Sequence, residues 1–321
     1  MPEPHPEVNA VLERVKREAP NLRSAKLSFA ESRALRKKET PAWLRLPLRE
    51  MARVEDRSIP GPGGPIRVRI CTPKSGEEGA RPVGLFFHTG GFVFSDLDTD
   101  DPQCRHIADE TGCIMVSVEY RLAPENKFPA AYDDAIAAWQ WLSKHAREIG
   151  GDGERFIVCG GSAGGNLTAG VCRHARDSGA PAITMQVVFV GAFNVHPPLP
   201  SHALHGMGGS GQAYSNMLRD AYRSSAADQN DVRYAPLVAT EFRGFPPAMI
   251  VVADCDAFCD EGRMYADKLR AAGVAVELMV AEGQIHQVFS WSGAFSQGPK
   301  VLDRAAAALC KALEAKAALQ S

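Results

Sequence analysis

Short apolar segments alternate with helical patterns through most of this chain, and that alternation limits the folds that it can adopt. Apolar runs typical of strands buried on both faces cover residues 83–87, 114–118, 156–159, 183–190 and 248–253. Patterns with helical spacing lie between and after them, at 101–111, 130–148, 163–177, 260–272 and 300–319. Strands that alternate with helices favour a three-layer α/β fold, in which a mainly parallel sheet carries helices on both faces.

The first fifty residues do not follow this alternation. Amphipathic patterns at 7–20 and 27–38 predict two helices outside the sheet, so residues 1–50 form an N-terminal helical segment. The main domain, 51–321, is interrupted at about 193–244 by a stretch that contains paired prolines and paired glycines. This stretch is too long for a plain connection and resembles a lid insert.

The sheet is expected to have exposed edges. Residues 53–59 and 66–70 flank a Gly-Pro-Gly-Gly turn, and the strict alternation of the second segment predicts an edge hairpin with one face in solvent. Residues 275–280 predict a further strand. Its edge leaves open the pairing of two subunits as a homodimer.

Composition and charge argue against several classes of protein. The net charge of -2, a pI near 6.5 and the absence of a basic stripe indicate no nucleic-acid partner. No apolar run approaches the roughly 20 residues of a membrane span, and the N-terminus lacks the features of a secretory signal. The eight cysteines show no metal-binding spacing, so we expect reduced thiols in a cytoplasmic protein without metal or other cofactor.

A candidate nucleophile lies where a buried strand passes into a helix. Residues 160–164 read Gly-Gly-Ser-Ala-Gly, and the outer glycines permit a turn tight enough to expose Ser162 at the end of the sheet. The helix that begins at Ala163 directs its free NH groups toward the same point. A Gly-X-Ser-X-Gly sequence also arises by chance in glycine-rich turns, so its position between strand and helix carries the prediction.

A second glycine-rich loop follows the strand at 83–87. Residues 88–92 read His-Thr-Gly-Gly-Phe, and we expect the backbone NH groups of Gly90 and Gly91, together with that of Ala163, to bind an oxyanion. The alternative is an ordinary strand-to-helix loop whose histidine is structural.

Candidates for the catalytic acid and base come later in the chain. Asp254, Asp256 and Asp260 follow the strand at 248–253, and His286 follows the next strand. Catalytic groups of open α/β sheets gather at these strand ends, and Ser, Asp, His is an established order for a catalytic triad. These considerations leave the choice of aspartate open, and Asp260 can equally be the N-cap of the helix that follows.

Four motifs together resemble those of the hormone-sensitive-lipase family of α/β-hydrolase esterases. Counterparts of the family's HGGG, YRLAPE, GDSAGG and DPLRDEG motifs lie at residues 88–91, 120–125, 160–165 and 256–262. The resemblance spans about residues 50 to 315 and implies the α/β-hydrolase fold. It also selects Asp256 as the acid beside Ser162 and His286, and implies hydrolysis of carboxylic esters with short to medium acyl chains through an acyl-enzyme on Ser162.

The resemblance further implies a helical cap over the site, made of the N-terminal helices and the 193–244 insert. Such a cap closes an apolar pocket around a small-molecule ester. Phe92, Phe94 and Met217 are candidate walls of this pocket, although each can equally be an ordinary core or surface residue.

Two other functional classes stay open. Plant gibberellin receptors resemble the same family, bind a ligand without turnover and have lost the triad histidine, so the presence of His286 argues against a receptor. An acyltransferase or amide hydrolase with the same triad is not separated from an esterase, because pocket shape selects the acceptor.

The chain departs from the family pattern in three places. Thr89 replaces a glycine, Gly161 replaces an aspartate, and Gln287-Val288 replaces Gly-Phe after the histidine. Because a β-branched residue tolerates positive φ poorly, either Thr89 has ordinary backbone angles or its loop has shifted.

We predict that Thr89→Gly changes turnover of an ester by less than about tenfold, because neither alternative requires the threonine side chain in the reaction. Steady-state kinetics measures this. A loss on the order of a thousandfold, the scale of a missing oxyanion donor, would instead show that the threonine has a role of its own.

Overall fold

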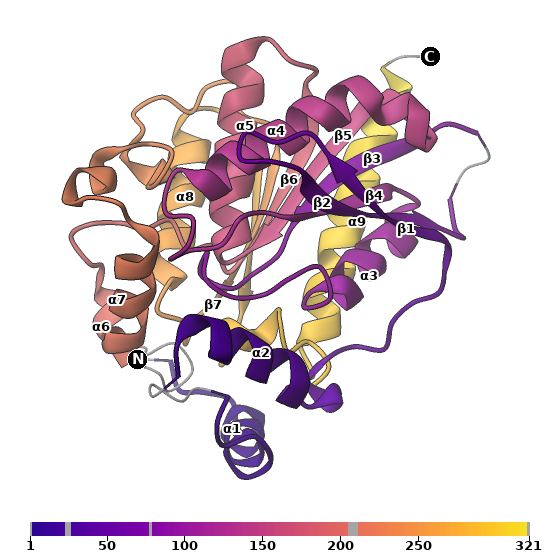
Figure 1. Cartoon of the computed structure of the whole chain (residues 1–321). Helices are drawn as coiled ribbons and strands as arrows, with labels where there is room; N and C mark the ends of the chain where they lie inside the picture. The colour runs from indigo at the N-terminus through magenta and orange to yellow at the C-terminus, as the bar shows by residue number, and fades with distance from the viewer. Residues whose placement is uncertain (1, 23–26, 77–78, 205–210, 320–321) are drawn as a thin grey trace.

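The computed structural model describes residues 2–22, 27–76, 79–204 and 211–319 (Figure 1). In these residues the centre is an eight-stranded sheet in the order β1-β2-β4-β3-β5-β6-β7-β8. Its strands are β1 Met51–Ile59, β2 Ile66–Pro73, β3 Arg81–Phe87, β4 Ile114–Glu119, β5 Gly151–Gly161, β6 Ile183–Phe189, β7 Ala248–Ala253 and β8 Val276–Ala281. Only β2 runs antiparallel to its neighbours, β1 and β4, so the predicted edge hairpin and mainly parallel sheet are confirmed.

Helices cover both faces of this sheet (Figure 1). The α-helices of the described residues are α1 Pro6–Glu18, α2 Phe29–Glu39, α3 Asp101–Thr111, α4 Ala130–His145, α5 Ala163–Ser178, α6 Pro200–Leu204, α7 Gly211–Tyr222, α8 Cys259–Ala271 and α9 Gly298–Ala318. Helices α3 and α9 pack together on one face, and α4, α5 and α8 cover the other. The three-layer fold class is therefore confirmed.

The apolar runs of the central strands follow from this layering. Leu85 and Phe87 of β3 belong to the hydrophobic cluster of α4, α5 and α8, whereas Phe86 belongs to the cluster of α3 and α9. All three side chains are fully buried. A strand covered on both faces needs apolar side chains at successive positions, which is the pattern in the sequence.

The N-terminal helices lie at one end of the sheet, at the bottom of Figure 1, with α6 and α7 beside them. Helix α1 is attached to the loop that follows β8. The His5 NH donates to the Gly283 carbonyl at 2.8 Å, and the Glu7 carboxylate accepts from Gln284 Nε2 at 2.8 Å and from the Ser296 NH at 3.1 Å. These bonds anchor the start of the chain to the segment that carries His286.

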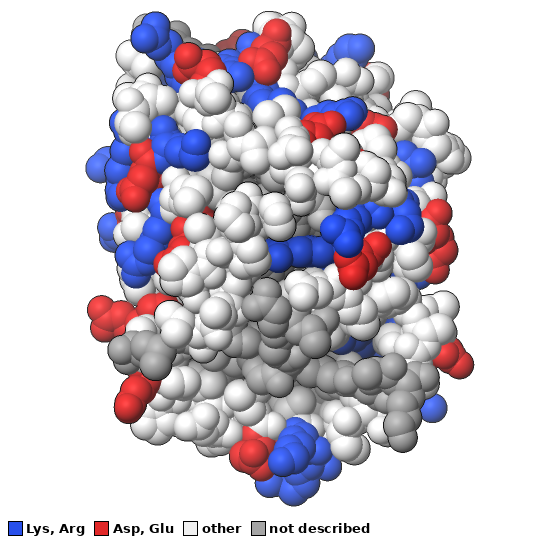
Figure 2. Space-filling view, turned by 90° about the vertical axis from the view of Figure 1, so that its left-hand side faces the viewer, with Lys and Arg blue, Asp and Glu red and all other residues white. Residues whose placement is uncertain are grey.

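Charged side chains and cysteines are both possible signs of function in the sequence. On the face seen in Figure 2, acidic and basic side chains lie in small mixed groups among uncharged residues. All eight cysteines are free thiols. No helix within the described residues combines the length and apolar character needed to cross a bilayer.

Candidate active site

Ser162 occupies a strained turn between β5 and α5. Its φ of 53° and ψ of -115° lie where residues other than glycine are uncommon. Hydrogen bonds hold the turn in place: the Ser162 NH donates to the Phe189 carbonyl at 2.8 Å, and the Ser162 carbonyl accepts from the Gly165 NH at 3.0 Å and the Ala192 NH at 3.1 Å. The backbone of β6 and the residues after it therefore fix the position of the serine.

The two outer glycines of the motif are required by close backbone approach. A Cβ on Gly160 would collide with the carbonyl of Gly164, and a Cβ on Gly164 would collide with the carbonyl of Phe87 in β3. No rotation of a side chain relieves either clash, because the opposing atoms are backbone. Local sequence and strand packing thus dictate the tight turn that the motif predicts.

Ser162, His286 and Asp256 form a continuous hydrogen-bonded line. His286 Nε2 is 2.9 Å from Ser162 Oγ, and His286 Nδ1 is 2.8 Å from Asp256 Oδ2. Asp256 is 1% exposed, and its Oδ1 accepts from the Phe258 NH at 3.2 Å. A buried carboxylate on Nδ1 fixes the imidazole tautomer and leaves Nε2 free to take a proton from the hydroxyl group.

The rival aspartates do not contact His286 in the described part of the chain. Asp254 Oδ1 is buried without a hydrogen-bond partner there. Asp260 is the second residue of α8, whose N-cap is Phe258, so the prediction that Asp260 is the N-cap is wrong. Its carboxylate instead accepts from the Ser201 NH at 2.9 Å, at the start of α6.

The loop after β3 has the backbone that its glycines allow. Gly90 and Gly91 have φ values of 119° and 61°, whereas Thr89 does not have positive φ. Position 89 therefore has ordinary backbone angles, the first of the two alternatives. Within the described residues, the NH groups of Gly90, Gly91 and Ala163 donate to no other group of the protein, which leaves them free for an oxygen of a ligand.

Three buried side chains support this loop. His88 Nδ1 donates to the Thr89 carbonyl at 2.7 Å, its ring stacks on Tyr120 with 4.1 Å between centroids, and the Tyr120 hydroxyl donates to the His88 carbonyl at 2.9 Å. The Thr89 NH donates to Asp100 at 2.6 Å. Burial lowers the pKa of His88 and raises that of Asp100, so both favour their neutral forms. Tyr120 belongs to the motif at residues 120–125, whereas no sequence pattern predicted a role for Asp100.

A cavity of about 300 Å³ opens beside the serine. Its lining combines Ser162, His286 and the glycine pair with side chains of α1, α2 and α7, among them Val15, Arg36, Tyr214 and Leu218. Leu218 lies against Gly91, because a Cβ on Gly91 would stand 2.7 Å from its Cδ1.

The predicted wall residues lie in three different places. Phe94 lines this cavity. Phe92 lines a smaller cavity of about 30 Å³ that also reaches Ser162, and its ring stacks on Tyr222 at 3.8 Å. Met217 packs against the main hydrophobic cluster and is in neither lining. Their contact with substrate stays a prediction.

A buried glutamate ties the insert to the triad. Glu261 on α8 is fully buried, and its Oε1 lies 2.8 Å from His202 Nε2 of α6 and 3.5 Å from a guanidinium nitrogen of Arg219 in α7. The ring of Phe258 makes edge contacts with both His202 and His286, with centroids 5.7 and 5.2 Å apart. Neither His202 nor Arg219 was singled out from the sequence, because the partners are distant along the chain.

One group within the described residues has atoms close enough to share a metal ion. It consists of His106, Glu110 and Asp303, on α3 and α9, and the two carboxylates are exposed. None of the three lines the cavity beside Ser162.

Comparison with known proteins shows which family has this fold and these motifs. Residues 84–290 match the family described as alpha/beta hydrolase fold. Esterase LipI of Mycobacterium tuberculosis is 37% identical over 268 residues, covering 83% of this chain and 84% of that protein. The ethyl acetate hydrolase of Pseudomonas putida is 34% identical over 229 residues, covering 70% of this chain and 71% of that protein.

A solved structure agrees over nearly the whole chain. An ester-hydrolase from the metagenome of Lake Arreo, complexed with a derivative of bipyridine phosphonate, has a TM-score of 0.90 and 34% identity, covering 96% of this chain and 98% of that one. This chain belongs to the hormone-sensitive-lipase family of α/β-hydrolase esterases. It is a carboxylic ester hydrolase, as its motifs predict.

Two departures from the family pattern occupy the same space in this esterase. A Cβ on Gly161 would stand 2.6 Å from Cε1 of Phe289 and 2.8 Å from Cγ2 of Thr89. The threonine methyl and the phenylalanine ring therefore fill the volume into which a side chain at 161 would project. The loss of the family aspartate and the gain of the threonine are compatible with each other for this reason.

Restoring the family residue, Gly161→Asp, should lower the free energy of unfolding by about 1–3 kcal/mol, because it overpacks this contact. Chemical denaturation measures the effect. In the double variant with Thr89→Gly the loss should be smaller but not abolished, since Phe289 still opposes the new side chain. A single variant as stable as the wild type would contradict this account.

Proposed function

We propose that this esterase hydrolyses carboxylic esters with short to medium acyl chains through an acyl-enzyme on Ser162. The observation that carries the proposal is the line of hydrogen bonds from Asp256 through His286 to Ser162, with distances of 2.8 and 2.9 Å. Both bonds join buried side chains, so little solvent competes for either.

In acylation, His286 Nε2 accepts the hydroxyl proton while Ser162 Oγ attacks the ester carbonyl carbon. The carbonyl oxygen becomes an oxyanion, and the NH groups of Gly90, Gly91 and Ala163 bind it. The imidazolium, stabilised by the Asp256 carboxylate, then gives its proton to the departing alcohol. Water then attacks the acyl carbon while His286 takes its proton, and the imidazolium returns that proton to Ser162 Oγ as the bond to the acyl group breaks and the carboxylic acid leaves.

The size of the cavity supports the acyl-chain preference. A volume of about 300 Å³ suits a small ester better than a long-chain lipid. Among the relatives, the ethyl acetate hydrolase is named for an ester with a two-carbon acyl group. Phe94 is a candidate wall of the acyl pocket because it lines this cavity, and Phe92 is a candidate in the adjoining one.

The N-terminal segment 1–50 and the insert 193–244 are proposed to act together as a cap on the 51–321 domain. Helix α2 contributes Arg36 to the cavity and α7 contributes Leu218, so both segments contact the space that the substrate would occupy. A cap of this kind limits the access of water to the reacting carbonyl.

A cytoplasmic location is proposed on the basis of the cysteines, because thiols persist in reducing compartments and all eight are free. A homodimer formed through the sheet edge at β8 stays a prediction, to which the half-buried residues of that strand are suited.

Ser162→Ala should abolish hydrolysis of p-nitrophenyl esters from acetate to laurate, with at least a roughly thousandfold loss of kcat for butyrate. Ser290→Ala is the matched control, because Ser290 lines the same cavity and has no place in the reaction. Release of p-nitrophenolate measures both variants. Undiminished turnover by Ser162→Ala would end the proposal, and a wild-type preference for laurate would refute the chain-length assignment.

A further inference from the structure

The cavity beside Ser162 carries more positive charge than a neutral ester requires. Its charged lining residues are Arg33, Arg36, Lys37, Arg45, Asp96 and Asp98. The four cations come from α2 and the segment just after it, whereas both carboxylates come from the loop that follows β3. Which of these charges already have partners decides what the cavity can bind.

Two of the cations are neutralised by carboxylates of the protein. Arg33 pairs with Glu125 at 2.8 Å and donates to the Val93 carbonyl at 2.6 Å. Lys37 Nζ lies 2.9 Å from Asp96 and 3.0 Å from Asp98. Neither Arg33 nor Lys37 therefore offers an uncompensated charge to a ligand.

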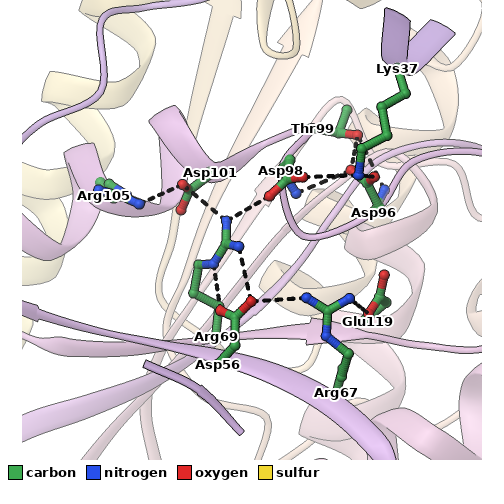
Figure 3. A network of polar contacts seen from close by, with 10 residues as sticks. All are labelled: Lys37, Asp56, Arg67, Arg69, Asp96, Asp98, Thr99, Asp101, Arg105 and Glu119. Atoms are coloured by element: carbon green, nitrogen blue, oxygen red, sulfur yellow. Dashed lines mark hydrogen bonds and ion pairs between the residues drawn. The ribbon is translucent and has the colours of Figure 1, made fainter. Parts of the chain in front are cut away.

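The two carboxylates of the lining are also fully engaged (Figure 3). Asp98 accepts from Arg69 at 2.9 Å in addition to Lys37, and Asp96 accepts from the Thr99 hydroxyl at 2.9 Å. Burial raises the pKa of Asp96, but the hydrogen bonds from Lys37, Thr99 and the Asp98 NH, together with the charge of Lys37, outweigh burial and keep that pKa below its usual value. Both carboxylates thus stay ionised within the network of Figure 3, which does not include Arg36.

Arg36 has no carboxylate partner among the described residues. One terminal nitrogen donates to the Tyr214 hydroxyl at 2.9 Å, and its Cζ lies 4.1 Å from the centroid of the Phe94 ring. Its Nε is buried and has no hydrogen-bond partner within the described part of the chain. A buried donor without an acceptor is costly, so a guanidinium in this state is ready for an anionic acceptor from the ligand.

Arg45 adds a second uncompensated charge to the same cavity. It is half-buried, and no ion pair to a described carboxylate involves it. Its positive charge acts on the buried Asp100 behind the Thr89 loop, where it lowers the pKa that burial raises. Two guanidinium groups in one cavity favour a negatively charged occupant over a neutral one.

We propose that the ester substrate carries a carboxylate, which pairs with Arg36 while Ser162 attacks the ester carbonyl. Arg45 supplies further positive potential to the same cavity. The substrate class is therefore a half-ester of a dicarboxylic acid, or a hydroxy acid that is acylated on its hydroxyl group and keeps a free carboxylate. A guanidinium matches a carboxylate because its planar donors bind both oxygens at once. This inference rests on the proposed esterase function of Ser162.

The test compares charged esters with neutral isosteres. One pair is mono-p-nitrophenyl adipate and its methyl ester, which differ in charge on the acyl side. The other is 4-(butyryloxy)benzoate and its methyl ester, which differ on the alcohol side. We expect kcat/KM to be at least about tenfold higher for the charged member of one pair, and that pair identifies the side that carries the carboxylate.

Variants of α2 then assign the preference to Arg36. Arg36→Gln should lower kcat/KM of the preferred charged ester by about tenfold or more and leave its neutral isostere nearly unchanged, and Arg36→Lys should retain part of the preference. Lys38→Gln is the matched control, since it removes one charge from an exposed position of the same helix outside the cavity. Lys38→Gln should leave kcat/KM for the charged ester and for its neutral isostere as in the wild type.

Several results would overturn the proposal. Wild-type enzyme that hydrolyses the neutral esters equally well or better in both pairs would refute carboxylate recognition while leaving the esterase function intact. An equal loss for charged and neutral esters in Arg36→Gln would make Arg36 structural. Failure of the wild type to hydrolyse any of the four esters would instead count against the proposed function itself.

Discussion

The strained backbone at Ser162 is the constraint on which the rest of this site depends. A positive φ at a serine is unfavourable, and it persists because the close approach of β3, β5 and α5 and the hydrogen bonds to β6 hold the turn. Gly160 and Gly164 make that approach possible, since each faces backbone carbonyl groups. The strain therefore originates in the packing of the sheet and holds the hydroxyl at one point beyond the strand ends.

Other elements of the site are held relative to that point by polar contacts. Tyr120 and Asp100 hold the loop that contains Gly90 and Gly91 through hydrogen bonds to the backbone of His88 and Thr89. Glu261 connects the insert, through His202, to the helix that follows Asp256. Helix α1 is hydrogen bonded to the segment before His286. The segments proposed as a cap are thus attached to the loops of the triad acid and base, so cap position and triad geometry are physically linked.

The sheet, the hairpin and the positions of Ser162 and His286 could be predicted because their signals are local: apolar runs, glycines at fixed offsets and chain order. Asp256 needed the family motif, since Asp254 lies just as close along the sequence. The role of Arg36 could not be predicted, because its surplus charge depends on which carboxylates reach Arg33 and Lys37 in space. The contact between the Thr89 methyl group and the space beside Gly161 could not be predicted for the same reason, because it depends on which residues meet in the fold.

The most direct test of the central claim is covalent labelling with a p-nitrophenyl alkylphosphonate, followed by mass spectrometry of tryptic peptides. The peptide 156–173 contains Ser162 as its only serine, so an adduct there is readily assigned. The account predicts release of about one equivalent of p-nitrophenolate per chain, full loss of activity and an adduct on Ser162. Complete inhibition with the adduct on another residue, or turnover that survives stoichiometric labelling of Ser162, would contradict it.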